Sequence, residues 1–355
     1  MHQLSASADM TPELLSPEEL DSLAIADPEI NNTLEGTCFD PGRPRPQATA
    51  SDDSPPPRDR IEQAPEVPPR TPTVKRRFSF FYTKSGACLR LILYHSSIRP
   101  TEPLPLLLWH HGVEGSMNKP GSNARWFQDV VTNNRCIVAV PQSRIGSKPR
   151  SNLPRLATLV EDAWHALKRL REEKMGRKFD FDIGKGLLLG GEGVGAAVAS
   201  AVALRMRDDG LGMLVSGVYL SAGAYFDPDA IPEHFRPHYR SRSDERGIHA
   251  PQPLGERAKV ACEVLEAADG DIKAANWASG HADMPKIYLQ VCGLDVLRDD
   301  GILYAHLLAE AGNGTWLDVY PGTPHAFWHS CPGTKIAEKW EEETLRGLLW
   351  LLSSK

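Results

Sequence analysis

The sequence predicts an α/β protein with a mostly parallel central sheet and helices on both faces. Two observations predict it. Short apolar runs that are typical of buried strands alternate with longer segments whose apolar residues recur at helical spacing. This alternation continues from about residue 75 to residue 353. Parallel strands need crossover connections, which helices usually supply, so the alternation indicates one large domain over residues 75–353.

The first 72 residues have a different composition. They are rich in Pro, Ser, Asp and Glu, and Phe39 is their only aromatic residue. Such a segment buries too little apolar surface to offset its ordering entropy, so we expect residues 1–72 to be a mostly disordered leader. Short helices are expected within residues 11–23, because the Ser-Pro-Glu-Glu run at 16–19 is a helix start signal. A leader without a specific partner is expected, and a regulatory or docking role is the alternative.

The first half of the domain is expected to contain a hairpin, two buried strands and two helices. In chain order, the hairpin, a strand, a helix, the second strand and an amphipathic helix are expected at residues 77–94, 104–109, 124–133, 136–140 and 156–174. The amphipathic helix is indicated by Leu159, Ala163, Leu167 and Leu170, which lie on one helical face.

The second half repeats the alternation of strands and helices. Strands are expected at residues 186–190, 214–220, 286–292 and 315–320. Helices are expected at residues 196–207, 301–311 and 336–352. Residues 226–283 interrupt this rhythm with a long segment of mixed composition, which indicates an insertion outside the sheet.

Charge and composition exclude several classes of protein. The net charge of −6 does not suit a nucleic-acid-binding protein, which needs a basic face. The first residues lack the pattern of a signal peptide, and no apolar run reaches the roughly 18 residues of a membrane span. The six cysteines include no C-x-x-C pair, so reduced thiols are expected rather than a zinc site. We therefore expect a cytoplasmic protein without a metal, a cofactor or a membrane partner.

Three segments at predicted strand ends share one functional pattern. Residues 191–195 form a sharp strand-to-helix turn with Gly193 at its apex, and Asp295 and His325 follow two later strands. The carboxyl ends of parallel strands lie at one edge of a sheet, so these segments are expected to meet. A tight turn followed by an acid and then a histidine is the chain order of a hydrolase triad, in which the apex is normally serine in G-x-S-x-G.

These segments resemble the hormone-sensitive-lipase-like family, the α/β-hydrolase fold-3 esterases, whose turn reads G-[DE]-S-A-G-G. Residues 293–301 resemble the family's G-x-D-P-L-x-D-[DE]-G segment, and His325 begins its H-x-F motif. The resemblance covers residues 75–353. It implies an α/β-hydrolase fold in which Asp295 is the acid and His325 is the base. It also implies that residues 226–283 form a cap over the pocket, although a solvated insertion is the alternative.

The chain departs from this family at the apex of the turn. Gly193 has no side chain and so cannot form an acyl-enzyme. Three serines are candidates for a substitute nucleophile, namely Ser116, Ser143 and Ser221, but each is expected to be a turn or cap residue. His329 follows His325 by four residues, and we expect a surface histidine there rather than half of a metal site.

A second departure lies in the loop that corresponds to the family's oxyanion motif H-G-G-G. This chain has His111, Gly112, Val113 and Glu114 there, and the amide of Val194 would complete the oxyanion hole. The backbone donors are retained. A carboxylate that points inward would oppose a developing negative charge by about 4 kcal/mol at ~4 Å, whereas one that points to solvent would not.

Three functions remain open. The first is a step in secondary-metabolite biosynthesis that avoids acyl transfer and uses His325 and Asp295 as a general base, since the chain is similar to hydrolases of fungal secondary-metabolite clusters. The second is a non-catalytic receptor for a small molecule, and the third is ester hydrolysis through a substitute nucleophile. For each of these functions the partner is expected to be a small hydrophobic or amphiphilic molecule. For the first function this molecule is expected to be polyketide-like. A homodimer is expected as an additional assembly.

Overall fold

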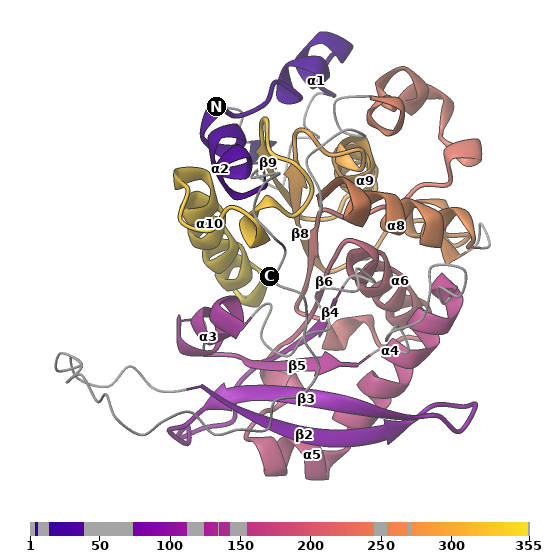
Figure 1. Ribbon diagram of the computed structural model, residues 1–355. Helices are drawn as coiled ribbons and strands as arrows, with labels where there is room; N and C mark the ends of the chain where they lie inside the picture. Colours follow the sequence, from indigo (N-terminus) through magenta and orange to yellow (C-terminus); the bar gives the residue numbers. More distant parts are fainter. Residues whose placement is uncertain are drawn as a thin grey trace, which may run out of the picture.

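The computed structural model describes residues 4–5, 14–38, 74–111, 124–133, 135–142, 155–244, 254–268 and 272–353. One large sheet crosses the molecule, and helices cover both of its faces (Figure 1). The predicted α/β architecture, with its mostly parallel sheet, is therefore confirmed.

The sheet has nine strands in the described residues, in the order β1-β9-β8-β7-β6-β4-β5-β3-β2. The strands are β1 (Leu4–Ser5), β2 (Val74–Tyr82), β3 (Cys88–Ser96), β4 (Leu106–His110), β5 (Ile137–Pro141), β6 (Leu187–Glu192), β7 (Gly217–Ser221), β8 (Lys286–Cys292) and β9 (Thr315–Tyr320). Strands β5, β4, β6, β7, β8 and β9 are parallel, whereas β1, β2 and β3 pair antiparallel at the two sides. The carboxyl ends of the parallel strands therefore share one edge, where sites of such sheets form.

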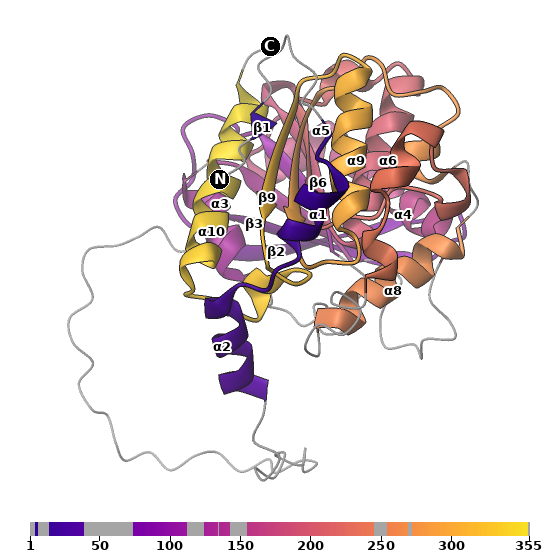
Figure 2. The same cartoon turned by 90° about the horizontal axis from the view of Figure 1, so that it is seen from above.

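Two hydrophobic cores lie on opposite faces of the sheet. Strand side chains alternate between faces, so Leu106 and Leu108 of β4 enter one core and Leu107 and Trp109 enter the other. The helices are α1 (Pro17–Leu23), α2 (Pro28–Cys38), α3 (Ala124–Asn133), α4 (Leu156–Leu170), α5 (Glu173–Phe179), α6 (Val194–Asp208), α8 (Leu254–Glu266), α9 (Arg298–Glu310) and α10 (Lys335–Leu352). Helices α4, α6 and α9 cover the first face, and α3 and α10 cover the second (Figure 2).

The structure differs from the expected disordered leader over residues 14–38, which form α1 and α2. Ser16 caps α1 as predicted, and its backbone and hydroxyl exchange hydrogen bonds with Glu19 in a capping box. Leu20 is 1% exposed and packs into the first core, whereas Ile30 is completely buried in the second. A few well-spaced apolar residues are enough to order this stretch, although the average composition of the leader is polar.

The segment that begins at residue 226 is fixed to the start of α9 by two buried carboxylates. Asp300 accepts hydrogen bonds from the Phe226 amide, the Tyr239 hydroxyl and the Arg242 guanidinium. Asp299 accepts a hydrogen bond from the Ser241 amide at 2.6 Å. Charge-assisted hydrogen bonds are among the strongest in proteins, so these contacts hold the segment firmly on the helix that follows the Asp295 loop.

A buried polar network lies within the second core. The Gln290 amide nitrogen lies 2.7 Å from the Tyr288 hydroxyl, 2.8 Å from the Tyr320 hydroxyl and 3.0 Å from the Thr344 hydroxyl, and its two protons are shared among these three oxygens. Its carbonyl oxygen accepts a hydrogen bond from the Tyr219 hydroxyl. One glutamine therefore joins strands β7, β8 and β9 to helix α10 through groups that have no access to water.

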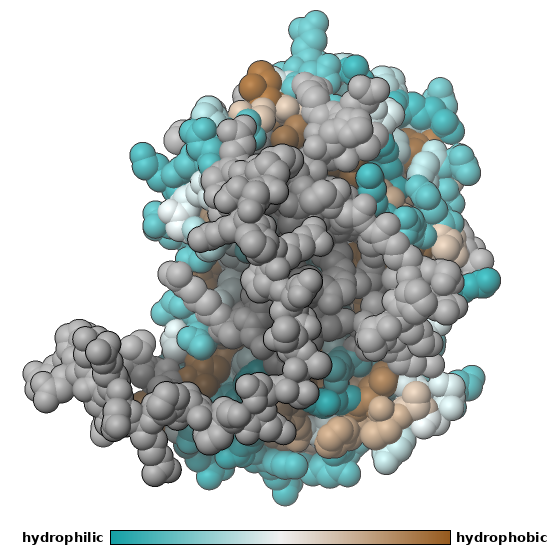
Figure 3. Space-filling view, viewed as in Figure 1, coloured by the Kyte–Doolittle hydropathy of each residue, from teal (hydrophilic) through white to brown (hydrophobic). Residues whose placement is uncertain are grey.

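The surface is mixed in character. Figure 3 shows hydrophobic residues, in brown, near the hairpin of β2 and β3. Phe78, Phe80 and Tyr82 are exposed there because β2 is an edge strand that presents alternate side chains to solvent. Among the described residues, no helix has the length and apolar character that crossing a membrane requires.

Candidate active site

The turn between β6 and α6 has the backbone conformation of a tight strand-to-helix junction. Gly193 has φ 57° and ψ −123°, in a region that favours glycine. The neighbouring glycines are required by close packing. A Cβ atom on Gly191 would lie 2.1 Å from the carbonyl oxygen of Gly195, and one on Gly195 would lie 2.0 Å from that of His110. The apex of this turn therefore presents backbone and no side chain.

Asp295 and His325 meet at the carboxyl edge of the sheet. The loop after β8 carries Asp295, and the loop after β9 carries His325. Nδ1 of His325 lies 2.7 Å from Oδ2 of Asp295, and each side chain is 1% exposed. The second carboxylate oxygen accepts a hydrogen bond from the Leu297 amide at 3.0 Å. The acid thus fixes the ring orientation and places the Nδ1 proton toward itself.

A second buried contact connects the turn to the His325 loop. Glu192, next to Gly193, accepts hydrogen bonds from Nε1 of Trp328 at 3.0 Å and from Nε2 of His329 at 2.9 Å. The His329 side chain is only 13% exposed, so the expectation of a surface histidine is wrong. No local sequence pattern predicts this contact, because Trp328 and His329 lie 136 and 137 residues from Glu192 along the chain.

The described part of the predicted oxyanion region consists of His111 and Val194. Gly112, Val113 and Glu114 lie outside the described residues. The Val194 amide is in the first turn of α6, where amides have no acceptor within the helix. Desolvation lowers the pKa of His111 to about 4, although the nearby Glu192 carboxylate acts in the opposite direction.

Of the three candidate serines, only Ser221 is described. It ends β7 and is completely buried. Its carbonyl oxygen accepts a hydrogen bond from the Gly193 amide at 3.0 Å. Ser221 thus supports the turn through its backbone carbonyl oxygen. Ser116 and Ser143 lie outside the described residues.

The N-terminal segment lies directly on the two loops that carry the acid and the base. The Gly322 amide donates to the Leu23 carbonyl oxygen at 2.7 Å, and the Asp27 amide donates to the Gly322 carbonyl oxygen at 3.0 Å. A Cβ atom on Gly293 would lie 2.3 Å from the same Leu23 oxygen. The backbone of residues 23–27 therefore contacts both loops at positions where a larger residue does not fit.

A small cavity with a mixed polar and apolar lining lies beside His111. It has a volume of about 20 Å³ and is lined in part by Gln142 and Asp162. That volume suits a single water molecule. Among the described residues, no group of three or more His, Cys, Asp or Glu side chains could hold a metal ion.

Comparison with known proteins gives a consistent pattern. The family model described as "alpha/beta hydrolase fold" matches residues 107–329. An AB hydrolase superfamily protein of Schizosaccharomyces pombe is 27% identical over 258 residues, which are 72% of this chain and 73% of the relative. A versiconal hemiacetal acetate esterase of Dothistroma septosporum is 31% identical over 180 residues, with coverage of 49% of this chain and 53% of the relative.

One solved structure with the same fold covers nearly the whole chain. The crystal structure of vibralactone cyclase superimposes with a TM-score of 0.73 at 24% sequence identity, and it covers 96% of this chain and 98% of its own. The overlap extends beyond the residues that the family model matches.

Proposed function

The chain belongs to the alpha/beta hydrolase fold family, and from this premise we propose that it transforms a small hydrophobic molecule without acyl transfer. His325 would act as the general base, and Asp295 would orient it. The reaction would be a tailoring step in secondary metabolism, such as a cyclisation, isomerisation, dehydration or retro-aldol cleavage. Each of these requires the movement of a proton rather than a covalent acyl intermediate.

The observation behind this proposal is the buried pair of His325 and Asp295 beside a turn that lacks a side chain. Gly193 lies at the apex of the turn, where the family motif G-x-S-x-G has its serine nucleophile, so ester hydrolysis through this turn would have no attacking group. The pair itself remains suited to proton transfer. A carboxylate 2.7 Å from Nδ1 stabilises the imidazolium that forms when Nε2 takes a proton.

The substrate class is proposed from the relatives. The Dothistroma septosporum relative is named for versiconal hemiacetal acetate, which supports a polyketide-like substrate for this chain. Vibralactone cyclase, named for a ring closure, shares only the fold at 24% identity. It supports the narrower point that proteins of this fold are not all named as esterases.

A deletion and complementation experiment tests the proposal. Deletion of the gene should cause one small molecule to accumulate, and the natural chain should restore its conversion. A His325→Ala variant should fail to restore it, because the general base is gone. The matched control is His165→Ala, which removes a histidine of α4 that lies near Glu161 and outside the expected cap. Full restoration by His325→Ala would contradict the proposal.

A non-catalytic binding protein is the second candidate. The favouring observation is the absence of a side chain at Gly193 together with the close packing of residues 23–27 on the site loops. Measurements of affinity and conversion with the accumulated molecule distinguish the enzyme from the binding protein. A binding protein keeps its affinity in the His325→Ala variant and shows no conversion by the natural chain, whereas an enzyme converts the molecule in a reaction that needs His325.

A further inference from the structure

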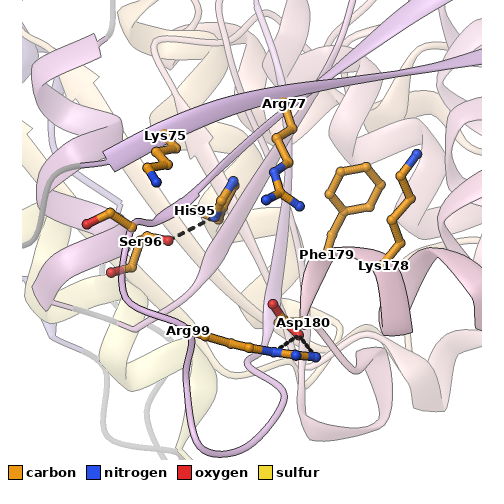
Figure 4. Close-up of a pocket in the computed structure, with 9 residues that line it drawn as sticks. Lys75, Arg77, His95, Ser96, Arg99, Lys178, Phe179 and Asp180 are labelled. Atoms are coloured by element: carbon orange, nitrogen blue, oxygen red, sulfur yellow. Dashed lines mark hydrogen bonds and ion pairs between the residues drawn. The ribbon is translucent and has the colours of Figure 1, made fainter.

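A basic cavity lies at the β2–β3 side of the sheet (Figure 4). Its volume is about 250 Å³. The charged and titratable side chains that line it come from β2, the end of β3, the loop that follows and the end of α5. They are Lys75, Arg77, His95, Arg99, Lys178 and Asp180.

The cavity is separate from the candidate active site. The Leu104 amide donates to the Asp180 carbonyl oxygen at 3.0 Å, shortly before β4 and β6 begin. This edge is therefore the amino end of the parallel strands, whereas Gly193, Asp295 and His325 follow their carboxyl ends. Strand β4 and its neighbours lie between the two places.

The alternation of β2 creates the cavity. Lys75 and Arg77 share one face of the strand, and Lys75 is directly opposite His95 in the register with β3. The next residue on this face, Ser79, is buried and contacts the Met175 sulfur of α5 at 3.8 Å. The strand therefore continues past the end of α5, which leaves a hollow beneath its two basic residues.

Positive charge in the cavity exceeds negative charge. Arg99 pairs with Asp180 at 2.9 Å. Lys75, Arg77 and Lys178 form no ion pair with any residue that the structure describes. Figure 4 shows Arg77 pointing from β2 toward the Arg99–Asp180 pair, and Lys75 beside His95 and Ser96. Like charges around one hollow repel one another, and a bound anion would remove that cost.

His95 adds an independent observation. Nδ1 of its ring donates to the Ser96 carbonyl oxygen at 2.8 Å. Its Nε2 is buried and has no hydrogen-bond partner within the described ranges. Because Nδ1 carries the ring proton, Nε2 is an acceptor, and a P–OH group of a singly protonated phosphate would supply its missing donor.

We propose that this cavity is a second ligand site, which binds the phosphate group of a small amphiphilic phosphate ester. Lysine ammonium and arginine guanidinium groups are the usual partners of phosphate. A neighbouring cavity of about 310 Å³ shares His95 and Arg99 and includes the apolar side chains of Leu104, Val131 and Ile137. It provides room for the apolar part of the ester.

Calorimetric titration of the full chain with hexyl phosphate tests the proposal. The natural chain should bind, and Lys75→Gln or Arg77→Gln should weaken binding by about tenfold or more, because each removes a charge-assisted hydrogen bond. The matched control is Lys84→Gln, which makes the same charge change in the turn at the far end of the hairpin. His95→Phe should also weaken binding, and all variants should retain the thermal unfolding temperature of the natural chain.

Three outcomes would overturn the proposal. One is no binding of hexyl phosphate, and another is equal weakening by Lys84→Gln and Arg77→Gln. The third is binding that occurs only after Asp52, Asp53, Asp59 and Glu62 are replaced by their amides, which would assign the cavity to the acidic leader of the chain. Inorganic phosphate should bind less tightly than hexyl phosphate. Equal affinities would show that the neighbouring apolar cavity does not contribute to binding. None of these results depends on His325, so the proposed function is tested separately.

Discussion

The Gly322 amide donates a hydrogen bond to the Leu23 carbonyl oxygen at 2.7 Å, across 299 positions of the chain. Gly322 lies three residues before His325, in the same loop. The N-terminal segment and the proposed base are therefore held by one short stretch of backbone. This arrangement makes residues 14–38 part of the site's support, and it gives the first prediction.

Gly322→Ala should detach the N-terminal segment. A Cβ atom at this position would lie 2.3 Å from the Ile25 oxygen and 2.5 Å from the Asp27 nitrogen, so the segment has to move. Gly333→Ala is the matched control, because Gly333 also has a positive φ but has open space around it. The control should cost about 1–2 kcal/mol of unfolding free energy from backbone strain alone. Gly322→Ala should cost more and should make residues 14–38 susceptible to limited proteolysis, and equal costs would refute the contact.

Gly193→Ser should introduce a nucleophile. The turn already has the φ and ψ that place a side chain at its apex, and His325 would be its base. We expect measurable hydrolysis of p-nitrophenyl acetate and labelling of residue 193 by a fluorophosphonate, neither of which the natural chain should show. Gly193→Ala has the same backbone strain and should remain inactive. No gain in the serine variant would mean that the oxyanion donors or access to the turn are also absent.

Asp295→Asn should preserve the fold and strongly reduce conversion of the accumulated metabolite. An amide nitrogen at this position opposes the Nδ1 proton, so the ring adopts the wrong tautomer for accepting a proton at Nε2. We expect a loss of about 10³–10⁴-fold in kcat, by analogy with the acid of serine hydrolases. Unfolding temperature and ligand affinity should change little. Activity within a factor of about two of the natural chain would exclude the pair from the chemistry.

Stability should fall as the pH decreases below 6.5, in part through His110. Burial is the main cause that lowers the pKa of His110 to about 3, from an ordinary value of 6.5. Between these two pKa values the unfolded chain binds a proton that the folded chain does not, so unfolding becomes easier at lower pH. This one group contributes a slope of up to about 1.4 kcal/mol per pH unit. Urea unfolding at several pH values should show a smaller slope for His110→Gln, while the exposed-site control His234→Gln should keep the original slope.

Gln290→Leu should be strongly destabilising. It leaves the hydroxyls of Tyr219, Tyr288 and Tyr320 without their shared partner in a core that excludes water. The Tyr219 hydroxyl loses its main acceptor, whereas Tyr288 still donates to Asp318, so we expect a loss of about 1–3 kcal/mol by urea unfolding. Gln128→Leu makes the same change at an exposed position of α3 and should stay within about 0.5 kcal/mol of the natural chain. A loss below about 1 kcal/mol for Gln290→Leu would contradict the role of the network.

The central sheet and the order of its elements could be predicted because their signals are local. Buried strands such as β4 and β6 are continuous apolar runs, and α4 shows its apolar face within four turns. The helix expected at residues 156–174 ends earlier, at Leu170, and the chain starts a new helix at Glu173. Helix ends depend on packing and capping, which periodicity alone does not contain.

The candidate site was predictable in part for the same reason. Gly193, Asp295 and His325 lie in short motifs that follow strands, and the structure brings Asp295 and His325 into contact. The hydrogen bonds of Glu192 with the His325 loop, and those of Gly322 with the N-terminal segment, join residues that are far apart in the chain. No local pattern marks such pairs, because each partner alone resembles an ordinary polar or flexible residue.

The backbone conformation at Gly193 also has a genetic consequence. Codons for glycine and serine can differ by a single base, and the φ of 57° and ψ of −123° already give position 193 the backbone of a turn apex. One point mutation can therefore be enough to supply the serine that the histidine and the aspartate lack. Selection on the product of the reaction, rather than on the scaffold, would then decide which of the two forms a lineage retains.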